Sequence, residues 1–63
     1  MSIPIYWRAW GQNPTRSGRT FTTEAEAVAW AEAEAPQSDG WSFIQHSRTG
    51  ELRLYRAETG RWS

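Results

Sequence analysis

The first part of the chain has Ile, Trp and Ala at every second position, which is the spacing of a β-strand with one buried face. The alternation covers residues 3–10 and divides the side chains into two sets, Ile3, Ile5, Trp7 and Ala9 on one face and Tyr6, Arg8 and Trp10 on the other. Residues 11–18 are rich in Gly, Pro, Asn and Ser and predict a loop, and residues 19–22 predict a short second strand. We therefore expect an N-terminal hairpin with a long loop.

The pattern changes to helical spacing after Thr23. Thr23 followed by Glu26 is a capping box, in which the Thr hydroxyl accepts from the backbone N–H of Glu26 and the carboxylate accepts from the N–H of Thr23. Six Ala between residues 25 and 35 favour a helix, and Pro36 ends it. Apolar residues three or four apart form the stripe expected to pack on a sheet: Ala27, Val28, Trp30, Ala31 and Ala35.

A second hairpin is predicted in the last third of the chain, from strands at residues 41–46 and 51–56 around a turn at residues 47–50. The resulting order is β-β-α-β-β. We predict an α+β fold, a small antiparallel sheet with one helix packed on one face. The expected core consists of Ile5, Trp7, Phe21, Val28, Trp30, Ala31, Leu52, Leu54 and one of Phe43 and Ile44.

The length of 63 residues predicts a single domain, residues 1–63, near the lower size limit for a self-sufficient core. Residues 57–63 are expected to form a loosely ordered tail unless Trp62 docks. The absence of cysteine excludes disulfides and cysteine-based metal sites. No apolar run is long enough for a transmembrane helix or the core of a signal peptide, so we expect a cytoplasmic protein without membrane contact.

Five Trp are more than a core of this size needs, so some are expected on the surface. One helix covers only one face of a sheet, and the uncovered face would carry aromatic and arginine side chains. Trp, Tyr and Arg dominate the binding energy of protein interfaces. The predicted partner-binding residues on this face are Tyr6, Arg8, Trp10, Arg53 and Tyr55.

The net charge is zero, but the charges are separated along the chain. Residues 1–21 contain three Arg and no acid, residues 22–40 contain five acids and no base, and residues 41–63 contain four Arg and two Glu. Zero net charge argues against strong non-specific binding to nucleic acid, yet it permits a molecule with one basic and one acidic face. A second candidate surface is therefore acidic, with carboxylates that would imitate a row of phosphates: Glu24, Glu32, Glu34 and Asp39.

The start of the predicted helix resembles a segment of the arm-type DNA-binding domains of phage tyrosine integrases, F-x-T-x-x-E-A-x-x-W/F. The matching residues are Phe21, Thr23, Glu26, Ala27 and Trp30. The resemblance covers residues 3–35 and implies a sheet that binds DNA. The chain differs from these domains in lacking Lys-rich strands and in continuing into a second hairpin.

The chain also resembles a family of small uncharacterised bacterial proteins with the same helix start and a later hairpin that ends in a His and a Gly turn. In this sequence the hairpin positions are Ile44, His46, Gly50 and Leu52. This resemblance covers most of the chain. It implies a ββαββ fold and no particular activity.

Catalytic and metal-binding patterns are missing from the sequence, including phosphate-binding loops, the dinucleotide fingerprint and the H-E-x-x-H motif. His46 is the only histidine, so we expect no zinc site and no other metal. Ser42 and His46 lie four residues apart on one strand, too far for a nucleophile and its base. We expect no cofactor and no enzymatic activity.

We predict a non-enzymatic interaction module, a small regulator or inhibitor of the kind that phages also encode. It would bind a protein partner through the aromatic and Arg sheet face or through the acidic helix. The alternative is a nucleic-acid-binding module that uses the same sheet face, with an affinity that falls steeply with salt. A homodimer through the uncovered face is compatible with either hypothesis.

Overall fold

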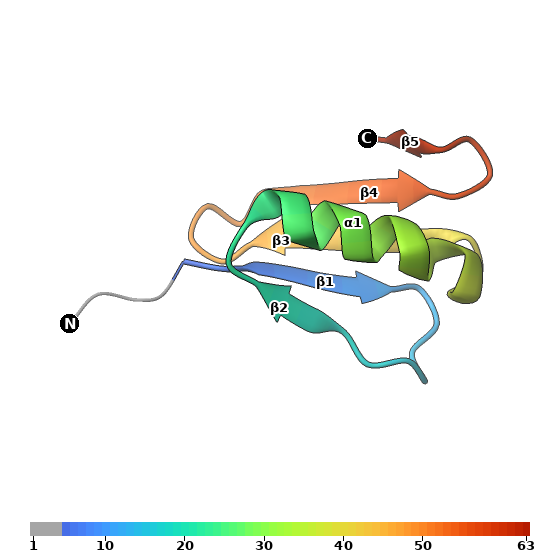
Figure 1. The fold of residues 1–63 in the computed structure, drawn as a ribbon, viewed down its shortest axis with the longest axis horizontal. Coiled ribbons are helices and arrows are strands. Elements are labelled where there is room, and N and C mark those ends of the chain that lie inside the picture. Colours follow the sequence, from blue (N-terminus) through green and yellow to red (C-terminus); the bar gives the residue numbers. More distant parts are fainter. Residues whose placement is uncertain (1–4) are drawn as a thin grey trace.

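A computed structural model describes residues 5–63 as a five-stranded antiparallel sheet with one helix packed against one face (Figure 1). The strand order across the sheet is β2-β1-β3-β4-β5, and the predicted α+β class is confirmed. The elements in chain order are β1 (Trp7–Gly11), β2 (Arg19–Phe21), the helix α1 (Glu24–Glu34), the 3-10 helix η1 (Ala35–Gln37), β3 (Trp41–His46), β4 (Leu52–Arg56) and β5 (Arg61–Trp62).

Strand boundaries differ from the prediction mainly at the two ends of the chain. β1 begins at Trp7, and Ile3 lies outside the described residues. Ile5 was expected in the core, but it precedes β1 and is 51% exposed. At the other end the structure contains a fifth strand, which pairs Trp62 with Tyr55 of β4. Gly60 makes the preceding turn with a positive φ of 66°, a conformation that glycine adopts without strain.

The N-terminus of α1 is capped by Thr23, whose hydroxyl accepts a 3.3 Å hydrogen bond from the backbone N–H of Glu26. The Glu26 carboxylate accepts from the hydroxyls of Thr23 and Thr22, at 2.8 and 3.3 Å, and not from the backbone as the capping box predicted. The α-helix ends before Pro36, which lies in η1. The expected helix start and stop are therefore found, with a different partner for Glu26.

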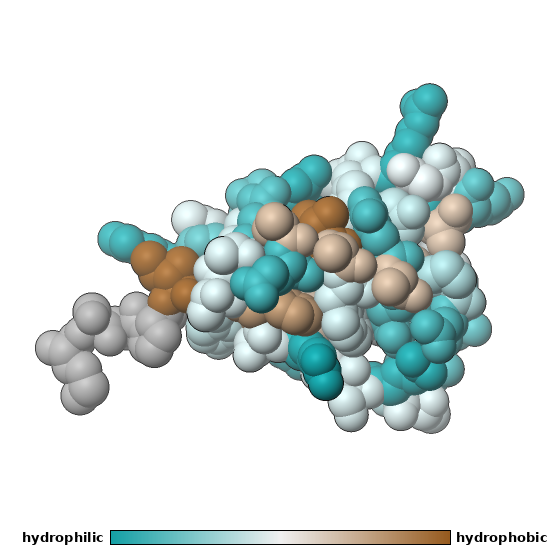
Figure 2. Space-filling model, in the orientation of Figure 1, coloured by the Kyte–Doolittle hydropathy of each residue, from teal (hydrophilic) through white to brown (hydrophobic). Residues whose placement is uncertain are grey.

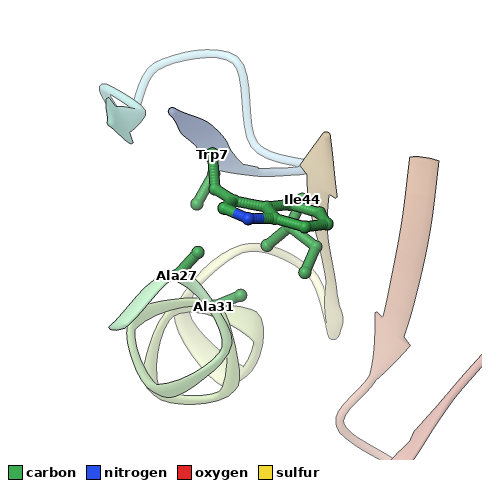
Figure 3. Close-up of a cluster of buried hydrophobic side chains, with 5 residues drawn as sticks. Trp7, Ala27, Ala31 and Ile44 are labelled. Carbon is green, nitrogen blue, oxygen red and sulfur yellow. The ribbon is translucent and has the colours of Figure 1, made fainter. Parts of the chain in front are cut away.

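Small residues allow α1 to lie close to the sheet. Trp7 and Ile44 are the large side chains between the two layers, and Ala27 and Ala31 point toward them from the helix (Figure 3). The Ser42 hydroxyl of β3 donates 2.7 Å to the Ala31 carbonyl. Trp7, Ala31 and Ile44 of the predicted core are buried, and three further predicted core residues pack at its margin, Phe21, Val28 and Trp30.

The register of β4 reverses the faces that were predicted for this strand. Leu54 pairs with Phe43, and both lie on the side of the sheet opposite α1. Leu52 belongs to the same side and is 55% exposed, so the prediction of two core leucines in β4 is wrong. Arg53 and Tyr55 lie instead on the helix side. The physical reason is that α1 packs over β1 and β3, so β4 lies beside the helix and not beneath it.

Candidate functional site

The open face, as we call the side of the sheet opposite α1, is the candidate site. The strand registers assign ten side chains to it: Arg8, Trp10, Thr20, Trp41, Phe43, Gln45, Leu52, Leu54, Arg56 and Arg61. Figure 2 shows the helix side, where apolar positions are scattered among hydrophilic ones, and the open face is turned away in this view.

A row of large apolar side chains crosses the middle of the open face. Trp10, Phe43 and Leu54 are directly opposite one another on three neighbouring strands. The rings of Trp10 and Phe43 stack with centroids 5.5 Å apart and an interplanar angle of 26°. All three side chains are half-buried by their neighbours in the sheet. We call them the central row.

Arginines lie on both sides of the central row. The Arg8 guanidinium is 5.3 Å from the centroid of the Trp10 ring, and that of Arg56 is 5.1 Å from the Trp41 ring. Such cation–π contacts hold a guanidinium in place while leaving its N–H donors at the edge of the plane available. Arg56 also pairs with exposed Glu58 at 3.0 Å. The open face thus combines an apolar centre with positioned cations.

A hollow of about 320 Å³ adjoins the open face at the β2 margin, lined by Arg8, Gly18, Arg19 and Thr20. Gly18 crosses close to β1, since a Cβ at this position would lie 2.6 Å from the Ala9 carbonyl oxygen. A side chain there would push the loop away from the strand. The hollow therefore depends on the glycine, and two arginines line it.

The helix side contains two members of the predicted sheet-face site, Arg53 and Tyr55. Arg53 donates 2.9 Å to Glu24, and its guanidinium lies 5.3 Å from the Trp62 ring. Trp62 in turn donates 3.0 Å to Glu32 and packs against Tyr55 with ring centroids 5.2 Å apart. The predicted set is thus divided, because Arg8 and Trp10 lie on the open face whereas Arg53 and Tyr55 pack beside the helix.

Tyr6 comes just before β1 and is 38% exposed. Its backbone N–H donates to the Ser47 hydroxyl, and its carbonyl accepts from the Ser47 N–H, both at 2.9 Å. These bonds fix the chain at the entry to β1. Tyr6 precedes the strand, so the registers assign it to neither face of the sheet.

Glu34 was predicted to contribute to an acidic surface, but its carboxylate is buried, with 6% of the residue exposed. Arg16 of the β1–β2 loop donates to both of its oxygens, and the Ser38 hydroxyl adds a 2.6 Å bond. The hydrogen bonds from Arg16, followed by that from Ser38, hold the pKa of Glu34 below its ordinary value, although burial acts in the opposite direction. This network ties the loop to the end of α1.

Two of the other predicted acidic residues accept hydrogen bonds on the helix side of the sheet. Glu24 and Glu32 bind Arg53 and Trp62, as described above. Asp39 lies in the turn before β3, with a positive φ of 60°. Three of the four carboxylates therefore stabilise the fold, which leaves a continuous acidic surface without support.

His46 closes the β3–β4 turn. Its Nδ1 accepts from the backbone N–H groups of Arg48 and Thr49 at 3.2 and 3.1 Å, and its ring meets Trp7 edge-on at 4.8 Å. These contacts give the histidine a structural role. Across residues 5–63 no cluster of three or more His, Asp or Glu is arranged to hold a metal ion.

Eight of the ten open-face residues were not in the predicted set, and the large or charged ones among them are Trp41, Phe43, Leu52, Leu54, Arg56 and Arg61. Trp41 and Phe43 lie an odd number of residues from Ile44, so they could have been assigned to the opposite face once Ile44 was taken as the core residue of this strand.

Comparison of the chain with protein-family models, curated proteins and solved structures finds no match, so the two resemblances stay predictions. The one α-helix in the described part of the chain has 11 residues and is too short to span a membrane.

Proposed function

We propose that the protein is a non-enzymatic interaction module that binds a protein partner through the open face. The observation that carries this proposal is the central row, Trp10, Phe43 and Leu54, which no element of residues 5–63 covers. Antiparallel sheets with one solvated face normally alternate apolar and polar residues, with the polar ones outward. A row of large apolar side chains on the solvent side is typical of an interaction surface.

Affinity capture from an extract of the native host tests this proposal. The open-face variant is Trp10→Thr/Phe43→Thr, in which threonine preserves strand propensity while removing the aromatic rings. The helix variant is Glu24→Gln/Glu32→Gln, which alters the acidic side only. We expect the native chain and the helix variant to retain the same protein and the open-face variant to lose it. Loss with the helix variant and retention with the open-face variant would overturn the proposal.

A nucleic-acid partner is the second candidate, supported by the Arg8 and Arg56 guanidinium groups beside the half-buried rings of Trp10 and Trp41. Aromatic rings can stack on bases while Arg contacts phosphate. Fluorescence anisotropy with a labelled 20-nucleotide dT strand separates the two candidates. Binding that weakens steeply between 50 and 200 mM salt, and that depends on Trp10, would favour nucleic acid. A flat titration would favour the protein partner.

A further inference from the structure

Cations dominate the charged groups of the open face. We infer that its partner is an acidic protein segment, with an apolar side chain anchored on the central row and carboxylates bound by Arg8 and Arg56. This inference rests on the proposed function and adds the chemistry of the partner. It follows from the distribution of charge, from the hollow beside Arg8 and from the spacing of the arginines.

Two arginines that lie outside the open face are held in ion pairs with acids of the helix. On the helix side and in the β1–β2 loop, Arg53 and Arg16 are neutralised by Glu24 and Glu34. The open-face strands contribute three Arg and no acid. Arg56 meets one exposed carboxylate, that of Glu58, at a site where solvent weakens the pair. Within residues 5–63, Arg8 and Arg61 form no ion pair, so their charges are available to a partner.

The hollow beside Arg8 provides a place for one of the carboxylates. Arg8 and Arg19 both line it, together with Thr20, which is the open-face neighbour of Arg8 on β2. Neither arginine is paired with an acid among the described residues. A guanidinium binds a carboxylate through two parallel hydrogen bonds, which a neutral or basic side chain cannot reproduce.

The spacing suits one continuous segment. Arg8 precedes Trp10 by two residues in β1, and Arg56 follows Leu54 by two residues in β4, so each arginine lies one side-chain row from the central row. Two residues along a strand span about 6.7 Å, and neighbouring strands are about 4.8 Å apart. An apolar anchor on the central row would therefore have an Arg within reach of the adjacent side chains in each direction.

The same features disfavour two other occupants. A second copy stacked on the open face would bring two sets of Arg8, Arg56 and Arg61 into one interface, where like charges repel. A single-stranded nucleic acid would satisfy the cations but not the aliphatic part of the face. Leu52 and Leu54 are aliphatic and offer no ring on which a base can stack.

Selection from a random 12-residue peptide display library tests the inference, with the folded native chain as target at 150 mM salt. The Trp10→Thr/Phe43→Thr variant serves for counter-selection. Selected peptides are then synthesised and titrated against two single variants, Arg8→Gln and Arg48→Gln. Both variants remove one positive charge, but Arg48 lies in the β3–β4 turn and belongs to none of the strands that form the open face. Circular dichroism confirms that each variant is folded.

We expect the selected peptides to combine Asp or Glu with an aromatic or aliphatic residue. Arg8→Gln should weaken their binding at least about threefold, which is the scale of an exposed ion pair, and Arg48→Gln should leave it unchanged. Selected peptides without an acidic excess, or equal effects of the two variants, would overturn the inference while leaving a protein-binding open face intact. Failure to enrich any peptide over the counter-selection variant would overturn it as well.

Two direct measurements address the other occupants. Sedimentation equilibrium that shows a dimer, lost in the Trp10→Thr/Phe43→Thr variant, would assign the open face to a second copy and overturn the inference. Binding of the labelled dT strand through Arg8 and Trp10 would assign it to nucleic acid, with the same consequence. Retention of the captured host protein by the Trp10→Thr/Phe43→Thr variant would overturn the proposed function itself, and this inference with it.

Discussion

Replacement of Gly11 by alanine tests the close approach between α1 and the sheet. A Cβ at Gly11 would lie 2.1 Å from the Ser38 hydroxyl oxygen and 2.4 Å from the Ser38 Cβ, with the Glu34 Cγ at 3.2 Å. Ser38 is fully buried, so its side chain has no free space into which it can move. The segment after α1 must therefore shift, and overpacking of this kind costs about 1–3 kcal/mol.

This cost is a large part of the stability of a small domain. A chain of this size has a total of about 3–9 kcal/mol, and each kcal/mol lowers the melting temperature of such a domain by about 4–8 °C. Thermal and urea unfolding of Gly11→Ala, followed by Trp fluorescence and circular dichroism, should show a loss within this range. The exposed loop variant Ser17→Ala is the control and should unfold like the native chain.

A double-mutant cycle with Ser38→Gly identifies the cause. Ser38→Gly removes both atoms closest to the new methyl group, at the cost of the hydrogen bond from Ser38 to Glu34. If the clash is the cause, Gly11→Ala should cost much less in the Ser38→Gly background than in the native one. Equal costs in the two backgrounds would refute the close approach at this position.

Three further predictions concern the helix, the loop and the last strand. The Glu34 pKa is lowered in the folded chain, so the contribution of this carboxylate to stability is complete above its ordinary pKa of 4.5 and is lost as pH falls through the folded pKa. The Glu34→Gln variant should therefore flatten this part of the pH profile of urea unfolding. An unchanged profile would contradict the buried network. Thr23→Ala should destabilise the fold by about 1 kcal/mol through loss of the N-cap, whereas Thr23→Ser should lose much less, and equal thermal shifts for the two would argue against capping. Trp62→Ala should detach β5 from β4. The backbone amide of Leu54, which donates 3.1 Å to the Ser63 carbonyl, should then exchange faster in hydrogen-exchange NMR, while the amide of Ile44 in β3 stays protected. Equal acceleration at both amides would indicate global destabilisation instead.

The elements with strong local signals were predictable from the sequence. The N-cap at Thr23 and the stop at Pro36 mark α1, and the strand expected at residues 41–46 matches β3 in both bounds. These signals depend on chemistry within a few residues of each other, so a single sequence contains them. The placement of Arg8 and Trp10 on the uncovered face was predictable for the same reason, because they alternate with buried Trp7 and Ala9.

Features that depend on distant contacts were not predictable. Alternation divides β4 into two faces, but the pairing of Leu52 with Gln45 decides which face lies beside the helix. β5 has only two residues and no periodic signal of its own. The bond between Arg16 and Glu34 joins residues 18 positions apart, so it could not be inferred from either local pattern. The contribution of β4 to the open face can therefore be assigned only once the strand register is known.

The edge strands are short, three residues in β2 and two in β5, and this limits how the protein can associate. Long unpaired edges are the usual place where a sheet adds strands from other molecules, and short ones reduce this risk of aggregation. An apolar sheet surface can thus be kept in water without polymerisation through the backbone. Binding through the open face, as proposed, would depend on side chains, which discriminate between partners by residue type where main-chain pairing would accept almost any extended segment.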